Sequence, residues 1–214
     1  MRTVAVTESV TTIAEAERKF GLRRNESKDF FTEWYNQLPE INSSDLASLE
    51  VLWRRYIYHR SGGHLLESTV MLLLVSPLLM ITGLYDPPFR LKAEESVLID
   101  VSDSEETLQG RIDVLVLRDR IWIIVLESKK MMLSVWSALP QTLAYLMASL
   151  NSDQRGDQQS DRPTFAMLTN GDDIVFVKLE SEQYGMSQVL SPLVNQGELE
   201  LAWRVLRKIA EIEV

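Results

Sequence analysis

The residues best suited to chemistry lie in the stretch Gly110 to Lys130, GRIDVLVLRDRIWIIVLESKK. It reads as two apolar strands joined by a tight polar turn, with acids and a lysine at one end. If the hairpin is centred near Arg120, Asp113 is expected opposite Glu127, and directly opposed residues share a face of the sheet. Lys129 follows Glu127 by two positions, so it is expected on that same face. The pattern therefore predicts two carboxylates and an ammonium at one end of a strand pair.

Such a cluster has a specific chemical use. Two converging carboxylates suit a hard divalent cation such as Mg²⁺ or Mn²⁺, which keeps water on its remaining positions. The cation acidifies a bound water and neutralises charge on a phosphate, while a nearby lysine orients that water or helps to deprotonate it. The cluster thus predicts metal-dependent hydrolysis of a phosphodiester. The plainer interpretation is a cross-strand salt bridge at a sheet edge, which contributes little in solvent.

Asp113, followed after a strand turn by Glu127, Ser128 and Lys129, resembles the bipartite active site of the PD-(D/E)XK nucleases. The resemblance implies that Asp113 and Glu127 bind the metal and that the backbone carbonyl of Ser128 completes the protein ligands. It also implies a catalytic role for Lys129. One departure is Ile112, which stands where the signature of the family has proline.

A second motif lies on the helix expected after these strands. Gln141 and Tyr145, in the segment QTLAY, resemble the Q-x-x-x-Y motif of RecB-like nucleases and of the N-terminal nuclease domain of type I restriction motor subunits. Glu67, on a helix before the first strand, sits where many members carry an additional acid. The resemblance implies positioning roles for Gln141 and Tyr145 and an accessory catalytic role for Glu67. Without it, Gln141 reads as a solvated helix residue, Tyr145 as a core aromatic, and Glu67 as an acid favoured at a helix start.

The elements that must position these residues follow from the periodicity of the chain. Helices are expected at 12–20, 29–38, 45–60, 64–82, 131–150 and 197–212, the fourth kinked or split at Pro77. Strands are expected at 93–101, 111–117, 121–128, 163–169 and 174–179, the last two joined by a turn at Asn170–Gly171. Residues 102–110 and 151–162 read as loops.

This order of elements predicts a mixed α/β or α+β layered fold. The resemblance covers about residues 64–180 and implies a restriction-endonuclease-like αβββαβ core, with a central mixed sheet flanked by helices. We expect an N-terminal helical region at 1–62 and the nuclease-like core at 63–214.

The composition indicates in which cellular compartment the protein is expected. The 214 residues are 45% hydrophobic and 25% charged, as in an ordinary globular domain. The chain has no cysteine, which excludes disulfides and thiolate metal sites and fits a reducing cytoplasm. The most apolar segment, Ser68 to Leu84, is short for a bilayer span and contains Pro77, so it is expected to be a buried helix. The N-terminus lacks the pattern of a signal peptide, and no membrane contact is expected.

The net charge of −9 argues against broad attraction to nucleic acid, although a local basic surface or a bound cation would serve instead. DNA is the expected substrate of a nuclease of this kind. A competing interpretation is a catalytically silent nuclease-fold module that acts through a protein partner, which the acidic charge favours. A third is a homodimer formed through the tryptophan-bearing N-terminal helices.

Overall fold

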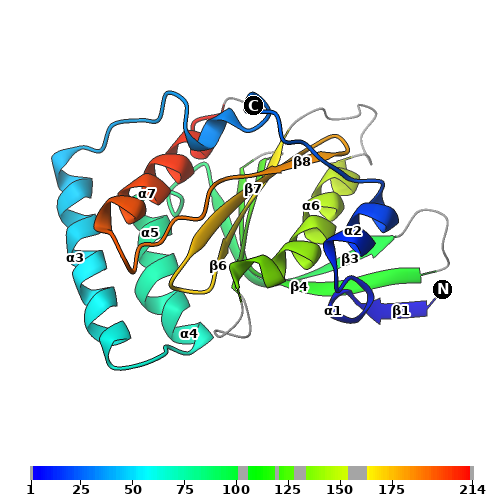
Figure 1. Ribbon diagram of the computed structural model, residues 1–214, viewed down its shortest axis with the longest axis horizontal. Helices are drawn as coiled ribbons and strands as arrows, with labels where there is room; N and C mark the ends of the chain where they lie inside the picture. The colour runs from blue at the N-terminus through cyan, green and yellow to red at the C-terminus, as the bar shows by residue number, and fades with distance from the viewer. Residues whose placement is uncertain (1, 101–105, 119–120, 128–133, 154–162, 213–214) are drawn as a thin grey trace.

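Within the described part of the chain, eight strands form one sheet of mixed direction through the centre of the molecule (Figure 1). This computed structural model describes residues 2–100, 106–118, 121–127, 134–153 and 163–212. The strands are β1 (Arg2–Ala5), β2 (Arg23–Arg24), β3 (Arg90–Asp100), β4 (Glu106–Arg118), β5 (Ile121–Glu127), β6 (Thr164–Thr169), β7 (Ile174–Glu180) and β8 (Gln183–Met186). Their order is β1-β4-β5-β6-β7-β8-β2, and β3 pairs with β4 off this path. The expected mixed α/β fold with a central mixed sheet is confirmed at this level.

Helices cover both faces of the sheet (Figure 1). They are α1 (Val6–Ser9), α2 (Ile13–Phe20), α3 (Ser43–Ser61), α4 (Glu67–Val70), α5 (Ser76–Ile81), α6 (Leu139–Asp153) and α7 (Gln196–Ala210). Single turns lie at η1 (Thr32–Trp34) and η3 (Val135–Ala138), and a π-type turn, η2 (Met71–Val75), joins α4 to α5. Helices α2 and α6 pack on one face with one hydrophobic cluster, and α3, α5 and α7 pack on the other with a second. None of the described helices is long and apolar enough to cross a membrane.

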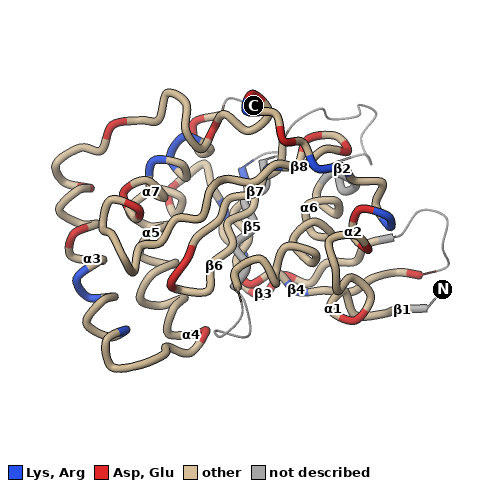
Figure 2. The backbone as a smooth tube through the Cα atoms, in the orientation of Figure 1, with Lys and Arg blue, Asp and Glu red and all other residues tan. Residues whose placement is uncertain are grey.

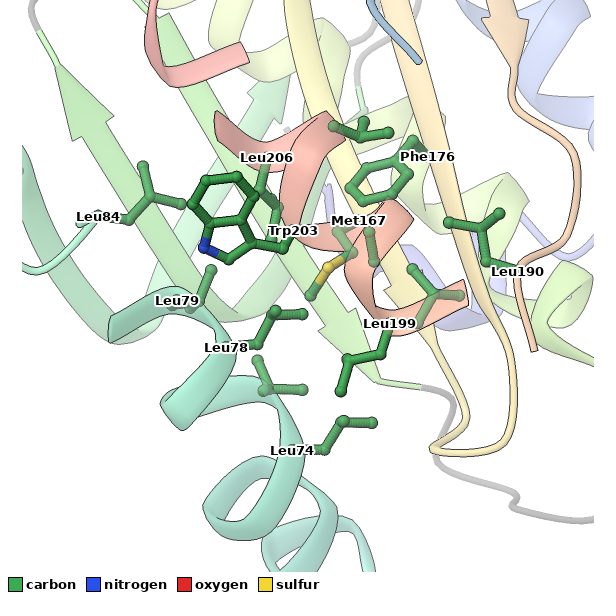
Figure 3. Close-up of a cluster of buried hydrophobic side chains, with 14 of the residues drawn as sticks. Leu74, Leu78, Leu79, Leu84, Met167, Phe176, Leu190, Leu199, Trp203 and Leu206 are labelled. Carbon is green, nitrogen blue, oxygen red and sulfur yellow. The ribbon is translucent and has the colours of Figure 1, made fainter. Parts of the chain in front are cut away.

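The second cluster joins α5 and α7 to the sheet (Figure 3). Leu78 and Leu79 of α5 meet Trp203 of α7, while Met167 and Phe176 enter from the paired strands β6 and β7. The indole N–H of Trp203 donates to the carbonyl oxygen at the last residue of α5 at 3.3 Å. The apolar segment around Pro77 is therefore a core helix, as its length indicated.

Proline shapes that helix in the expected way. Pro77 has no N–H to donate to the carbonyl four residues earlier, which interrupts regular α-helical bonding. The π-type turn Met71–Val75 directly precedes α5, in which Pro77 occupies the first turn. The expected helix at 64–82 is thus split at this point, and its first residues before Glu67 are not helical.

Several local expectations are wrong. The segment 29–38 forms only the turn Thr32–Trp34, because Lys178 of β7 binds the carbonyl of Phe30 and the carboxylate of Glu33, and these tertiary contacts override its helical pattern. Glu106–Gly110 belongs to a strand rather than a loop, because β1 pairs with it in parallel. The N-terminal segment 1–62 also contributes β1 and β2 to the sheet, which the sequence pattern did not indicate.

Candidate active site

Asp113 lies where the regular pairing of β3 with β4 is interrupted. The ladder pairs Val114 with Ala93 and resumes beyond Glu94, whose φ of 54° is left-handed. A non-glycine residue rarely adopts such a φ, so Glu94 marks a local distortion of the strand. The distortion lies directly beside Asp113 on the neighbouring strand.

The alternation of faces along β4 changes at the same point. Ile112 and Leu115 both belong to the cluster beneath α6, although they are three residues apart. Val114 and Val116 pack in the cluster on the opposite face. Residues on one face of a regular strand are two apart, so the alternation of β4 shifts between Ile112 and Val114. The register with β3 is the same on both sides of Asp113, so the change is local to this position.

Tyr145 of α6 reaches β4 next to this irregularity. Its hydroxyl oxygen accepts a hydrogen bond of 3.2 Å from the backbone N–H of Arg111. Burial raises the pKa of Tyr145, the Arg111 bond opposes that shift, and the negative charge of Asp113 adds to it. Tyr145 therefore contacts β4 two residues before Asp113.

Gly110 permits this contact, and the sequence did not single it out as a site residue. A Cβ built at Gly110 would lie 2.4 Å from the Cε1 and Oη atoms of Tyr145. Only glycine lets the ring approach the strand so closely without a shift of one or the other. The available signal was a glycine within a strand, which often marks the close approach of another group.

Gln141 lies one helical turn before Tyr145 and is half-buried. Residues four apart lie on the same side of a helix, so Gln141 and Tyr145 line one side of α6. Gln141 and Tyr145 therefore occupy successive turns on the same side of α6.

Glu127 is the last residue of β5, and its pairing corrects one expectation. Arg118 pairs with Ile121 and Val114 with Val125, so Ile112 rather than Asp113 is level with Glu127. The direct opposition of Asp113 and Glu127 is therefore wrong by one residue, because the hairpin is centred just before Arg120. The shared-face argument that depended on the opposition no longer holds.

Of the remaining motif residues Glu127, Ser128 and Lys129, the structure describes only Glu127. On its other side β5 runs parallel to β6, where Glu127 pairs with Thr169. Only the backbone of Glu127 is described. Ser128 and Lys129, the expected carbonyl ligand and catalytic ammonium, lie outside the described residues.

Glu67 begins α4 on the face of the sheet opposite α6, and it is half-buried. One turn later, Val70 lies against the β6–β7 turn, since a Cβ built at Gly171 would be 3.0 Å from Val70 Cγ2. That turn directly follows Thr169, the partner of Glu127. The start of α4 and the end of β5 therefore approach the same turn.

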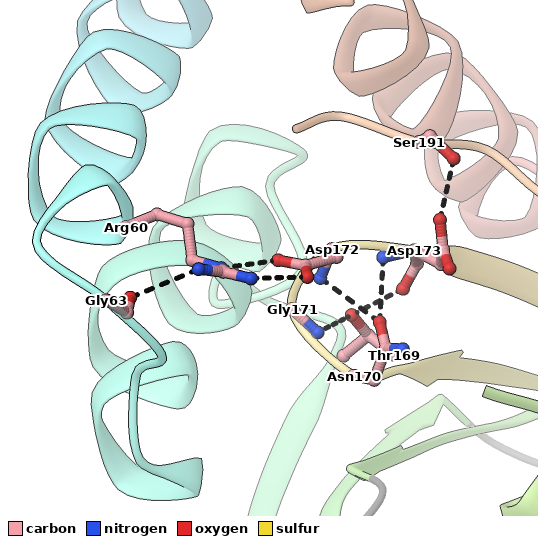
Figure 4. A network of polar contacts seen from close by, with 8 residues as sticks. All are labelled: Arg60, Gly63, Thr169, Asn170, Gly171, Asp172, Asp173 and Ser191. Atoms are coloured by element: carbon pink, nitrogen blue, oxygen red, sulfur yellow. Dashed lines mark hydrogen bonds and ion pairs between the residues drawn. The ribbon is translucent and has the colours of Figure 1, made fainter. Parts of the chain in front are cut away.

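The β6–β7 turn is held by a polar network (Figure 4). Asn170 Oδ1 accepts from the backbone N–H groups of Asp172 and Asp173 at 3.1 and 2.8 Å. The guanidinium of Arg60, near the end of α3, makes two hydrogen bonds of 2.7 Å to the carboxylate of Asp172. These bonds raise the pKa of Arg60. The turn expected at Asn170–Gly171 is confirmed, and it is anchored to α3 beside the end of β5.

No protein-family model matches the chain, and a comparison with curated proteins found no match.

Proposed function

We propose that this protein is a metal-dependent DNA nuclease of the PD-(D/E)XK type, with a restriction-endonuclease-like core. The observation that carries the proposal is the contact of Tyr145 with the Gly110–Arg111 backbone of β4, two residues before Asp113. The order α5, β3, β4, β5, α6, β6 supports it, since this is the αβββαβ order of such a core. In this proposal the protein cleaves DNA in the cytoplasm, during restriction or repair.

The carboxylates are the residues that would hold the cation. Asp113 and Glu127, with the carbonyl of Ser128, are hard oxygen donors of the kind that Mg²⁺ and Mn²⁺ prefer. When bound, the cation supplies an acidified water and neutralises charge on the scissile phosphate. Lys129 orients that water or accepts a proton from it. The irregularity at Asp113 supports a ligand role, because it frees this side chain from the regular alternation of β4.

Tyr145 acts as a neutral phenol in this proposal. A phenol already keeps its proton at neutral pH, and burial raises the pKa of Tyr145 further, so Tyr145 serves as a hydrogen-bond donor rather than a base. The Arg111 N–H already occupies one acceptor position on the oxygen, which fixes the direction of the hydroxyl. Tyr145 and Gln141 then position the Asp113 strand and the substrate from the α6 side. Glu67 is an accessory acid from the other side.

A cleavage assay tests the proposal. Plasmid and linear DNA are incubated with Mg²⁺ or Mn²⁺ and either the wild type, Asp113→Ala or Lys129→Ala. We expect the wild type to cleave and each variant to lose on the order of 100-fold or more in rate, as for removal of a catalytic acid–base group. Asp29→Ala, which removes an exposed aspartate, is the matched control and should cleave normally. Equal activity in the wild type and Asp113→Ala, or no cleavage at all, would remove the proposal.

The second candidate is a catalytically silent nuclease-fold module that acts through a protein partner. The net charge of −9 favours it, because the chain as a whole repels nucleic acid. Calorimetric titration with Mn²⁺ shows whether a metal site is retained. If the wild type binds Mn²⁺ and Asp113→Ala does not, the site is retained; heat of binding unchanged by the substitution assigns the cation elsewhere.

A further inference from the structure

The second half of α3 carries a basic surface on an otherwise acidic protein. Residues 51–66 hold three arginines and two histidines and no acid, in a chain with 31 acidic residues. Arg54, Arg55, Tyr58 and His59 are all exposed, and His64 follows in the exposed connection to α4. Figure 2 shows this basic segment as blue on the lower half of α3. We call these five residues the α3 basic surface.

Helical geometry gathers these side chains on one side. Leu52 and Tyr56 are buried toward the sheet. Arg54 with Tyr58, and Arg55 with His59, then form two neighbouring rows of residues four apart. Tyr58 is 75% exposed, and its ring meets that of His59 edge-on with centroids 5.3 Å apart. Tyr58 therefore presents an aromatic ring and a hydroxyl to solvent beside the two arginines.

The arginines of this surface are not engaged by acids of the described chain. The ion pairs of the described residues include Arg60 with Asp172, but none with Arg54 or Arg55. The exposed Arg23–Arg24 pair differs, since Glu26 lies 3.6 Å from Arg24. The charge of the α3 basic surface is therefore available to an external anion.

The helix that carries the α3 basic surface is linked to the end of β5. Arg60 joins α3 to the β6–β7 turn through Asp172 (Figure 4), and Thr169 before that turn pairs with Glu127. The connection from α3 continues through exposed residues into α4, which begins at Glu67. The helix that carries this surface is therefore linked, through one ion pair and one turn, to the strand end that carries the proposed site.

We propose that the α3 basic surface binds the sugar–phosphate backbone of duplex DNA and brings it to the end of β5. The choice of DNA as ligand rests on the proposed function. Guanidinium groups bind phosphate in a bidentate manner, and tyrosine and histidine add hydrogen bonds to backbone oxygens. Such contacts are independent of sequence. They attract DNA phosphates locally, although the protein as a whole, with a net charge of −9, repels them.

Fluorescence anisotropy with a short labelled DNA duplex in EDTA tests the proposal without any requirement for catalysis. Arg54→Glu/Arg55→Glu should lower the affinity at least about tenfold and reduce the slope of log affinity against log salt by about two. Arg23→Glu/Arg24→Glu changes the net charge by the same amount at another exposed arginine pair, and it should change the affinity no more than about twofold. Thermal melting checks the fold of each variant, and Arg54→Gln/Arg55→Gln replaces the first variant if it does not fold.

Each outcome is decisive. The proposal is overturned if the wild type does not bind the duplex, if the α3 variant binds like the wild type, or if both double variants lose affinity equally. Binding that is lost only in the α3 variant supports it. If that variant loses binding but the wild type shows no Mg²⁺- or Mn²⁺-dependent cleavage, DNA binding by the α3 basic surface is supported and the proposed nuclease activity is overturned. If the α3 variant cleaves DNA as fast as the wild type, the proposed nuclease activity is supported and the role of the α3 basic surface is overturned.

Discussion

The ring of Tyr145 lies against the Cα of Gly110, so that a Cβ at this glycine would be 2.4 Å from the phenolic oxygen. The contact joins α6 to β4 three residues before Asp113. It allows the hydroxyl to reach the backbone N–H of Arg111, two residues before Asp113. The geometry of the candidate site therefore depends on a residue without a side chain.

Substitution of Gly110 by alanine should separate α6 from β4. The added methyl group overpacks the contact with Tyr145, and overpacking of this kind costs about 1–3 kcal/mol in the free energy of unfolding. Urea denaturation of the two proteins measures the loss. Gly197→Ala is the matched control, because its nearest neighbour would be Asn195 Oδ1 at 3.4 Å, and it should not destabilise the fold.

The cause can be separated from a general effect of alanine in a strand. In a Tyr145→Ala background the ring is absent, so Gly110→Ala should cost clearly less than it does in the wild type. An equal cost in both backgrounds would mean that the ring contact is not the reason for the glycine.

Alkaline pH should destabilise the protein through its buried tyrosines. Burial raises the pKa of Tyr145 and Tyr184, and the hydrogen bond that Tyr184 donates to Glu17 raises it further. The unfolded chain loses these protons near pH 10, while the native state still holds them, so the free energy of unfolding falls as pH rises above about 10. Below that pH both states are protonated and the contribution is constant.

Urea unfolding across this pH range measures the effect. Tyr145→Phe/Tyr184→Phe should flatten the decline above about pH 10, because two linked protons are removed. Tyr58→Phe is the control, since Tyr58 is 75% exposed, and it should decline like the wild type. Parallel curves for the double variant and the wild type would contradict the prediction.

Much of the fold could be predicted because its signals are local. The turn at Asn170–Gly171 depends on the side chain of Asn170 and a left-handed φ of 91° at Gly171, both properties of the turn itself. Helix α3 begins where Asn42 caps two N–H groups, and α7 follows its own apolar stripe. A contact between the helix of Tyr145 and the strand of Asp113 was expected from the motif resemblance rather than from periodicity.

What the sequence could not provide depends on distant partners. Strand β1 is only four residues long and exists as part of the sheet through its pairing with β4. The irregularity at Asp113 is matched by the left-handed φ of Glu94, a residue of another strand. The one-residue error in the hairpin came from its centre, since the pairing of Arg118 with Ile121 fixes every later pair.

Lys178 should be among the least replaceable charged residues. Its side chain is 8% exposed, and its ammonium donates to Phe30 O and Glu33 Oε1 at 3.0 Å each. Replacement by methionine leaves the carboxylate of Glu33 buried without its cation, which costs about 3–5 kcal/mol when one partner of a buried pair is removed. Urea denaturation measures this loss.

The double variant Lys178→Met/Glu33→Gln identifies the origin of the cost. Once Glu33 is neutral, the remaining acid is Glu180, which lies 3.3 Å from the Lys178 ammonium and is 35% exposed, so most of the loss should be recovered. Failure to recover stability would assign the effect to packing against Phe30, whose ring centroid lies 5.2 Å from the Lys178 ammonium. Lys19→Met, at a pair 3.5 Å apart with more exposed side chains, should change stability by less than about 1 kcal/mol.

The ion pair of Arg60 with Asp172 should contribute more than an ordinary surface pair. Its side chains are only 15% and 30% exposed, and both of its hydrogen bonds are 2.7 Å long. A double-mutant cycle with Arg60→Gln and Asp172→Asn should give a coupling free energy of about 1–2 kcal/mol that persists in high salt. The pair Arg207–Glu211, with side chains 43% and 49% exposed, should give at most about 0.5 kcal/mol and lose it in salt. Equal coupling in the two cycles would show that Arg60 does not anchor the β6–β7 turn.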